Sequence, residues 1–336
     1  MKKLKILIFE YITGGGLNKS DLPESLAREG LLMLQSLLDN LVGIEMVECL
    51  IMLDFRMVGR LATNPYDIHI IRPEHECRQE LTRLMSLCDA VWPIAPESDF
   101  ILQTLCEEVE RSGKLLLTSP ASVVAIAGNK WLTYQHLRQH SINTVPTQRL
   151  SDFCFTPSEW IVKPVDGVGC EDSYLVSDQE DFDTVTSLLD KNNYIVQPHI
   201  QGAKISLSCL FKKGRGWLLC ANRQQFDIIN KQYHLTGITV NFTSDISMYQ
   251  DLVNDVAKAM TDLWGYAGID LIVTPDQILV LEINPRLTTS YAGLYAALGM
   301  NCADAVLDLL SGDPHLEPTH HQAVNIKITK QESYAS

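Results

Sequence analysis

The stretch GIDLIVTPDQILVLEINPRLTTSYAGL, residues 268–294, is the most informative part of this sequence. Two apolar runs of strand length flank the turn-forming residues Thr274-Pro275-Asp276-Gln277, and this pattern predicts an antiparallel hairpin. If the loop is Pro275-Asp276-Gln277, Asp270 on the first strand lies directly opposite Glu282 on the second. The hairpin therefore sets two acids against each other.

Asp270, Glu282 and Asn284 form a candidate metal site on this hairpin. Because side chains alternate along a strand, Glu282 and Asn284 share a face, while Leu281 and Ile283 point the other way. Two carboxylates and an amide oxygen are hard ligands of the kind Mg²⁺ prefers when waters and phosphates complete its coordination. A two-residue loop would shift the register and separate them. The alternative is that Asp270 caps a turn and Glu282 is a solvated edge charge, but an acid in a buried apolar strand is costly without a partner.

A second informative stretch is WIVKPVDGVGCEDSYLV, residues 160–176. One strand delivers Lys163, Gly167 and Gly169 bracket a turn, and another strand follows. A lysine beside a glycine loop supplies a point charge and close backbone N–H groups, both suited to phosphate oxygens. The motif lacks the Gly-Lys-Ser/Thr of a Walker A loop, and taken alone it also fits a simple hairpin turn.

A third stretch is GNKWLTYQHLRQHSINTVPT, residues 128–147. Lys130 opens an amphipathic helix that ends near Gln139. Taken alone, this residue is most simply a solvated lysine.

The first hundred-odd residues alternate short apolar strands with helical stretches. The predicted strands are 4–9, 46–53, 68–71, 90–94 and 114–117. This alternation favours a parallel sheet with helices on both faces. A short helical piece at 119–127 then leads into a small α+β lobe, which is followed by longer strands and a helix.

Composition narrows the class of protein. The 336 residues carry a net charge of −14, which disfavours a nucleic-acid binder. The nine cysteines are scattered without a C-x-x-C, as expected for reduced thiols in the cytoplasm. The apolar run near the start is too short for a signal peptide, and no stretch reaches the length of a membrane span, so we expect a cytoplasmic protein without membrane association.

In this order, the three stretches resemble the ATP-grasp superfamily of carboxylate–amine ligases over roughly residues 119–310. The resemblance implies an α/β chain: an N-terminal doubly wound (pre-ATP-grasp) domain at 1–118, followed by a two-lobed α+β ATP-grasp fold with a small lobe at 119–198 and a C-terminal lobe at 199–336. It implies that Lys130 and Lys163 bind ATP with the Gly167–Gly169 loop, and that the three hairpin residues bind Mg²⁺, with Mn²⁺ as an alternative. Arg286 and Lys163 are the implied catalytic residues.

The hinge segment departs from the family pattern. The ATP-binding residues implied there are Gln197, Pro198, His199 and Ile200. Gln197 occupies the position of an adenine-facing acid and retains an acceptor oxygen. Lys204 occupies the position of the ribose-binding acid and cannot accept a hydroxyl hydrogen bond.

Several further segments resemble a narrower group, the tyramine–L-glutamate ligases of methanofuran-type cofactor synthesis. They are Glu10–Gly16, Trp92–Glu97, Asn222–Gln224 and Leu287–Tyr291. This resemblance extends to nearly the whole chain. It implies small-molecule carboxylate and amine substrates, here glutamate and tyramine or a similar amine.

Candidate substrate-binding residues lie within these segments. Gly14, Gly15 and Gly16 follow the first strand at the edge where doubly wound sheets bind ligands, although a tight turn explains them equally well. Arg223 could clamp a carboxylate or pair with an acid of its own lobe. Thr289 and Ser290 face substrate or, in the simpler interpretation, cap the next helix.

The expected activity is ATP-dependent ligation through an acyl phosphate, catalysed by positioning and electrostatics. Two alternatives remain. One is a different ATP-grasp ligase of the peptide or D-alanine type, and the other is a non-catalytic ATP-binding protein of the same fold, which Lys204 and Pro198 favour. Family resemblance also implies a homodimer.

Overall fold

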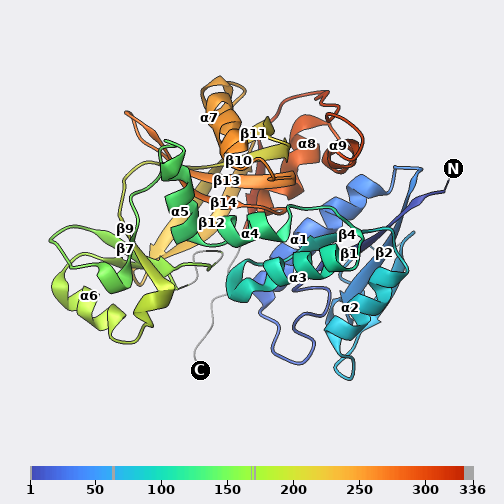
Figure 1. Cartoon of the computed structure of the whole chain (residues 1–336), viewed down its shortest axis with the longest axis horizontal. Coiled ribbons are helices and arrows are strands. Elements are labelled where there is room, and N and C mark those ends of the chain that lie inside the picture. The colour runs from blue at the N-terminus through green and yellow to red at the C-terminus, as the bar shows by residue number, and fades with distance from the viewer. Residues whose placement is uncertain (1, 63–64, 168, 170–171, 329–336) are drawn as a thin grey trace.

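The computed structural model describes residues 2–62, 65–167, 169 and 172–328 (Figure 1). Figure 1 shows two sheets. One lies at the right with the N-terminal helices, and the larger one extends from the centre to the lobe at the left. The first sheet is the predicted doubly wound domain, and the second is built from the rest of the chain.

The N-terminal sheet is parallel throughout its described strands, in the order β3-β2-β1-β4-β5. Its strands are β1 (Leu4–Glu10), β2 (Val47–Asp54), β3 (Asp67–Ile71), β4 (Ala90–Ile94) and β5 (Leu115–Leu116). Alternate residues of β1 face opposite helical layers: Ile6 and Ile8 pack with α1 (Glu24–Leu41), whereas Leu7 and Phe9 pack with α2 (Cys77–Ser86) and α3 (Ile101–Arg111). The doubly wound fold is therefore confirmed.

The second sheet pairs its described strands antiparallel, in the order β14-β13-β10-β11-β12-β8-β7-β9-β6, with β15 added beside β12. Its strands are β6 (Gln148–Arg149), β7 (Trp160–Pro164), β8 (Tyr174–Val176), β9 (Tyr194–Pro198), β10 (Ala203–Lys212), β11 (Arg215–Ile229), β12 (Gln232–Val240), β13 (Gly265–Val273), β14 (Ile278–Asn284) and β15 (Val324–Lys327). The sequence pattern did not predict β12. Most of this strand is only partly buried, so it lacks a strong apolar signal.

Three helices cover one face of the strands β10, β11, β13 and β14. They are α4 (Ala121–Ala127), α5 (Lys130–Gln139) and α7 (Ser247–Ala259), and they share one apolar core with these strands. The lobe that contains β7 and β9 has a separate small core, to which α6 (Gln179–Thr186) contributes Phe182. Short 3₁₀ turns occupy Phe55–Met57, Ser98–Phe100, Leu150–Asp152, Lys191–Asn193 and Thr289–Gly293.

A continuous core joins the N-terminal sheet to the other face of the large sheet. It combines α1 with α8 (Leu294–Leu298) and α9 (Cys302–Asp308), and it includes Tyr266 of β13. The Thr118 hydroxyl donates to the Pro285 carbonyl at 2.9 Å. The end of β14 is thereby held against the carboxyl edge of the parallel sheet, and the candidate site lies at this junction.

Candidate functional site

The β13–β14 hairpin brings the predicted metal ligands together, by a route that differs from the prediction. Val273 pairs with Ile278, so the turn has four residues, Thr274–Gln277, instead of three. A β-bulge at Leu281 then restores the register, and Asp270 pairs with Glu282 as predicted.

The bulge also decides which side chains face the site. Val280 and Ile283 pack in the helix-covered core, whereas Leu281 packs with Ile272 and Leu279 in a separate small cluster. The prediction that Leu281 points with Ile283 is therefore wrong. Because the extra residue lies in β14, Glu282 leaves the apolar face on which Val280 lies.

Hydrogen bonds tie these acids to neighbouring amides and cations. Asp270 accepts from Asn284 Nδ2 and from Gln224 Nε2, each at 3.1 Å. Glu282 Oε2 lies 3.4 Å from Lys130 Nζ. Gln224 was not among the predicted site residues. It is the last residue of the Asn222–Gln224 motif, and this motif is the signal that could have identified it.

The two carboxylates have pKa values shifted in opposite directions. Burial raises the pKa of Asp270, and the charge of Glu282 raises it further. Burial also opposes ionisation of Glu282, but Lys130 and Lys163 outweigh this effect and lower the pKa of Glu282. Two acids held together at a protein–solvent boundary are stabilised by a cation between them, which fits an oxygen-ligated divalent ion.

Lys130 is a buried residue of the site, so its interpretation as a solvated lysine is wrong. Asn129 caps α5 by accepting from the Trp131 and Leu132 amides, and this cap fixes Lys130 at the first helical position. Lys130 is 9% exposed, and its ammonium donates to the Gly167 carbonyl of the glycine loop. The lysine therefore joins the metal hairpin to the predicted phosphate loop.

Lys163 reaches the same region from β7. It is 7% exposed, and its positive charge contributes to the low pKa of Glu282. Gly169 has a φ of +62°, a backbone conformation that favours glycine. The described part of this loop thus has the two features from which a phosphate site was predicted.

Arg286 follows the hairpin and pairs with a residue of the N-terminal domain. Its Nε and Nη2 atoms donate to Glu97 Oε2 at 3.0 and 2.8 Å. Glu97 lies just beyond β4, at the carboxyl edge of the parallel sheet, and is 6% exposed. The segment Trp92–Glu97 carries part of the family resemblance, but Glu97 was not predicted to belong to the site; an acid at that edge of the sheet was the available signal.

Several of these residues line one small pocket. The residues that line it are Glu97, Ala127, Gly128, Lys130, Asp166, Gly167, Glu282, Ile283 and Asn284. The described residues contain no group of three or more His, Cys, Asp or Glu side chains suited to a metal. Two carboxylates and an amide fit Mg²⁺ only with waters and a phosphate ligand, so the donor set points to a metal–nucleotide pair.

The hinge residues are held by contacts of their own. Gln197 is buried and donates through Nε2 to Thr147 Oγ1 at 2.9 Å. The His199 ring lies between Glu159 Oε2 at 2.7 Å and the Tyr233 hydroxyl at 2.5 Å. Lys204 Nζ donates to the Ile200 carbonyl at 3.1 Å, so the residue in the predicted ribose position interacts with the hinge backbone. Pro198 pairs with Trp160 across β9 and β7.

The predicted substrate residues are more dispersed. Gly14 and Gly15 are buried, and a Cβ on Gly15 (φ +103°) would lie 2.5 Å from the Ile71 side chain. A Cβ on Gly16 would meet the Tyr11 ring at the same distance. The close packing supports the tight-turn interpretation of this loop.

Thr289 and Ser290 lie at the domain junction. The Thr289 hydroxyl donates to Glu29 Oε2 of α1 at 2.9 Å, and the buried Ser290 hydroxyl lies 2.9 Å from the Thr288 hydroxyl. Both residues lie within the 3₁₀ turn Thr289–Gly293, and the next helix, α8, has no side-chain cap, so neither hydroxyl caps it, contrary to the simpler interpretation.

Arg223 lies apart from the other predicted residues. Asp270, Ser206 and Asn222 form one row across the sheet, so the next residue of β11, Arg223, projects from the opposite face. There its guanidinium stacks 4.6 Å from the Phe242 ring centroid. The structure does not bring Arg223 to the carboxylates, and a clamp on a substrate bound beside them does not fit this position.

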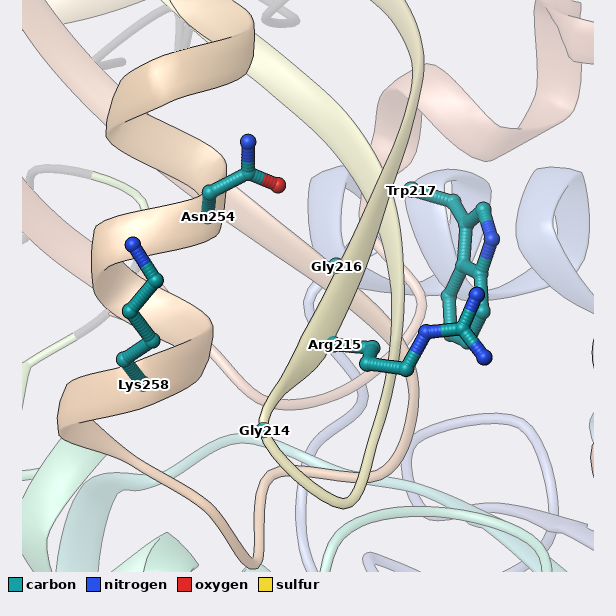
Figure 2. Close-up of a pocket in the computed structure, with 6 residues that line it drawn as sticks. All are labelled: Gly214, Arg215, Gly216, Trp217, Asn254 and Lys258. Atoms are coloured by element: carbon teal, nitrogen blue, oxygen red, sulfur yellow. The ribbon is translucent and has the colours of Figure 1, made fainter.

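A larger surface pocket shares no residue with this site. It has a volume of about 330 Å³ and lies between the β10–β11 turn and α7, where Arg215 stacks over Trp217 (Figure 2). Asn254 and Lys258 line it from the helix. None of the predicted ligands contributes to it. In the part of the chain that is described, no helix has the length and apolar character needed to cross a membrane.

This architecture is that of an ATP-grasp protein, in which a pre-ATP-grasp domain precedes an ATP-grasp domain. A model of the ATP-grasp domain matches residues 127–290, and a model of the pre ATP-grasp 3 domain matches residues 47–124. The resemblance inferred from the sequence is thus confirmed.

Two named ligases are similar to this chain over most of its length. The chain is 29% identical over 292 residues to a tyramine–L-glutamate ligase of Methanocaldococcus jannaschii, covering 86% of this chain and 84% of the relative. It is 28% identical over 294 residues to a tyramine–L-glutamate ligase of Methanocaldococcus fervens, covering 86% and 89%.

Solved structures share the fold. A protein of Archaeoglobus fulgidus assigned to the ATP-grasp superfamily superposes with a TM-score of 0.72 at 25% identity, covering 97% of this chain and 92% of that one. An L-amino acid ligase from Bacillus licheniformis superposes with a TM-score of 0.62 at 18% identity, covering 91% and 73%. The latter likeness shows the fold alone.

Proposed function

We propose that this protein is an ATP-dependent carboxylate–amine ligase that joins L-glutamate to tyramine, or to a similar amine, through an acyl phosphate. The observation that carries the proposal is the single pocket where Lys130, Glu282 and Asn284 meet Glu97, the partner of Arg286. The named tyramine–L-glutamate ligases at 28–29% identity support the choice of substrates.

Asp270, Glu282 and Asn284 would hold Mg²⁺, which supplies Lewis-acid neutralisation of the phosphate oxygens. Lys130 and Lys163 would bind the same phosphates, and Arg286 would stabilise the transferring phosphoryl group. The loop that contains Gly167 would cover the phosphates and exclude water from the acyl phosphate.

In the proposed reaction, a carboxylate oxygen of the acid attacks the γ-phosphorus, and ADP leaves. The amine nitrogen then attacks the acyl carbon, and phosphate departs with the electrons of the C–O bond. The ammonium form of the amine loses two protons overall, one to the departing phosphate and one to solvent. The protein itself forms no covalent bond in this scheme, so it would accelerate the reaction by orienting the substrates and stabilising developing charge.

ADP release with MgATP, L-glutamate and tyramine, each omitted in turn, tests this function. Release that requires both the acid and the amine is expected. Release with L-glutamate alone would indicate a different acceptor, and no release with any acid would contradict the proposal.

A second candidate is a non-catalytic ATP-binding protein. The contact of Lys204 with the Ile200 carbonyl favours it, because that hinge carbonyl already has a donor. Calorimetric binding of ATP without any ADP release would support this candidate.

A further inference from the structure

Glu97 has a carboxylate oxygen that finds no hydrogen-bond partner among the described residues. Both guanidinium donors of Arg286 converge on Glu97 Oε2. Its Oε1 is buried and accepts no hydrogen bond from the described residues. A paired arginine and carboxylate commonly use both oxygens, so this end-on arrangement leaves one acceptor for something else.

The residue that carries this oxygen lines the pocket of the candidate site. Glu97 lines the same pocket as Lys130, Glu282 and Asn284, and only 6% of its surface is exposed. An unsatisfied buried carboxylate oxygen costs free energy unless a donor arrives. The pocket therefore favours a ligand that brings a hydrogen-bond donor to Glu97.

The backbone around Glu97 holds its side chain in place. Gly128 packs so closely that a Cβ there would lie 3.1 Å from the Glu97 Cβ. Asp99 and Phe100, which follow Glu97, both have left-handed backbone conformations (φ 53° and 58°), and the Asp99 amide donates to Asp166 Oδ2 at 3.0 Å. Strain of this kind in consecutive non-glycine residues persists where the surroundings enforce it, and it is common beside ligand sites.

Charge selects the ligand. Phosphate and carboxylate groups would be repelled by Glu97, and Mg²⁺ has its own ligands on the hairpin. Among the reactants of the proposed ligation, the remaining cation is a primary ammonium group. We infer that Glu97 Oε1 is the receptor for a substrate ammonium group, an inference that rests on the proposed function.

Two substrates carry such a group: the acceptor amine and the α-ammonium of L-glutamate. In either case, Glu97 would bind the ammonium through Oε1 while Oε2 orients Arg286. The reacting substrate would then lie beside the residue proposed to bind the phosphoryl group. Glu97 would thereby position the substrate against Arg286. The gain in rate would be largest when Oε1 holds the ammonium and Oε2 holds Arg286 at the same time.

The test compares wild type with Glu97→Gln, which retains shape and an acceptor for Arg286 but turns an amide N–H₂ toward the ammonium. The matched control is Glu108→Gln, because Glu108 also pairs with an arginine, Arg78, and has a buried oxygen without a partner among the described residues, yet does not line the pocket. Acyl phosphate is trapped as hydroxamate with neutral hydroxylamine, and amide formation is measured with tyramine.

If Glu97 binds the acceptor, Glu97→Gln retains hydroxamate formation from L-glutamate with an unchanged KM, and its KM for tyramine rises about tenfold or more. If it binds the acid, the KM for L-glutamate rises by a similar factor, and the preference for L-glutamate over glutarate, which lacks the ammonium, is lost. Either result supports the inference, provided that Glu108→Gln behaves as wild type.

Unchanged KM values for both substrates would overturn the inference, whether or not kcat falls, because Glu97 would then act only through Arg286. Absence of hydroxamate in wild type with every acid would instead refute the proposed function, and the inference with it. If Glu97→Gln does not fold, Gly128→Ala provides the second variant. A Cβ there would lie 2.9 Å from the Val124 carbonyl oxygen and 3.1 Å from Glu97 Cβ, so the added methyl group presses on Glu97 without removing its charge. It should raise the same KM by a smaller factor, and an unchanged KM would count against the inference.

Discussion

At the residue scale, the site depends on two acids whose proximity is unfavourable unless a positive charge lies beside them. Asp270 and Glu282 face each other across the hairpin, and Lys130 and Lys163 lower the pKa of Glu282. Two lysines and two acids thus lie together in a protein whose net charge is −14, and the lysines supply local positive charge for a phosphate.

Glu282→Gln should lower kcat by about 10²-fold or more, because it removes a proposed ligand of the metal that neutralises the phosphates. The fold should remain intact, as judged by circular dichroism. Glu80→Gln, which alters a surface acid paired with Arg83, is the control and should retain activity. Wild-type turnover by Glu282→Gln would remove Glu282 from the metal site.

Asp270→Asn should stabilise the protein without metal, increasingly so at high pH. The folded-state pKa of Asp270 is raised, so its contribution to stability is complete below the unfolded-state pKa and is lost as pH rises through the folded-state value. Because an asparagine side chain does not ionise, the variant does not lose this stability. Urea unfolding in EDTA from about pH 6 to about pH 9 measures the difference. A difference that stays constant as pH rises would show that the Asp270 pKa is not raised.

At the element scale, the sequence predicts the strands and the acid pair but not the β-bulge in β14 that aligns them. The three-residue loop and the four-residue turn with a bulge place Asp270 opposite Glu282 equally well, and period-two alternation alone cannot distinguish them. The local pattern around Lys130 predicted only a solvated lysine, and the family resemblance alone placed it in the ATP site, for a related reason. Burial of a helix-start lysine depends on a distant loop, here at Gly167, and no local pattern encodes that contact.

The glycine loop after β1 provides a test of an element. Gly15→Ala should destabilise the protein by about 2–4 kcal/mol, because it combines a positive φ with a clash against Ile71. Gly59→Ala is the matched control, since Gly59 also has a positive φ (84°) but no atom near its Cβ, so it should cost only about 1 kcal/mol. Equal losses in chemical denaturation would mean that the close packing around Gly15 contributes nothing.

At the scale of the whole molecule, the site exists only where two sheets meet. Arg286 and Glu97 come from different domains, as do Thr289 and Glu29. The sequence predicted both domains, but Glu97 was missed because its role depends on the docking of one sheet edge against the end of β14. The domain boundaries at 118 and 198 stay predictions.

The shared core predicts cooperative unfolding. Leu37 of α1 is fully buried between the N-terminal sheet and the C-terminal helices, and Leu37→Ala should cost about 2–5 kcal/mol. By hydrogen exchange, the amides of β1 and β11 should lose protection together. Loss of protection in β1 alone would show that the N-terminal domain unfolds as a separate unit.

The central claim, that the site activates a carboxylate as an acyl phosphate, is tested most directly by oxygen transfer. L-Glutamate labelled with ¹⁸O in its carboxylates is incubated with MgATP, tyramine and the enzyme, and the inorganic phosphate is analysed by mass spectrometry. One ¹⁸O atom is expected in each phosphate released, since the carboxylate oxygen bonded to phosphorus leaves with it. Amide formation with unlabelled phosphate would contradict the account.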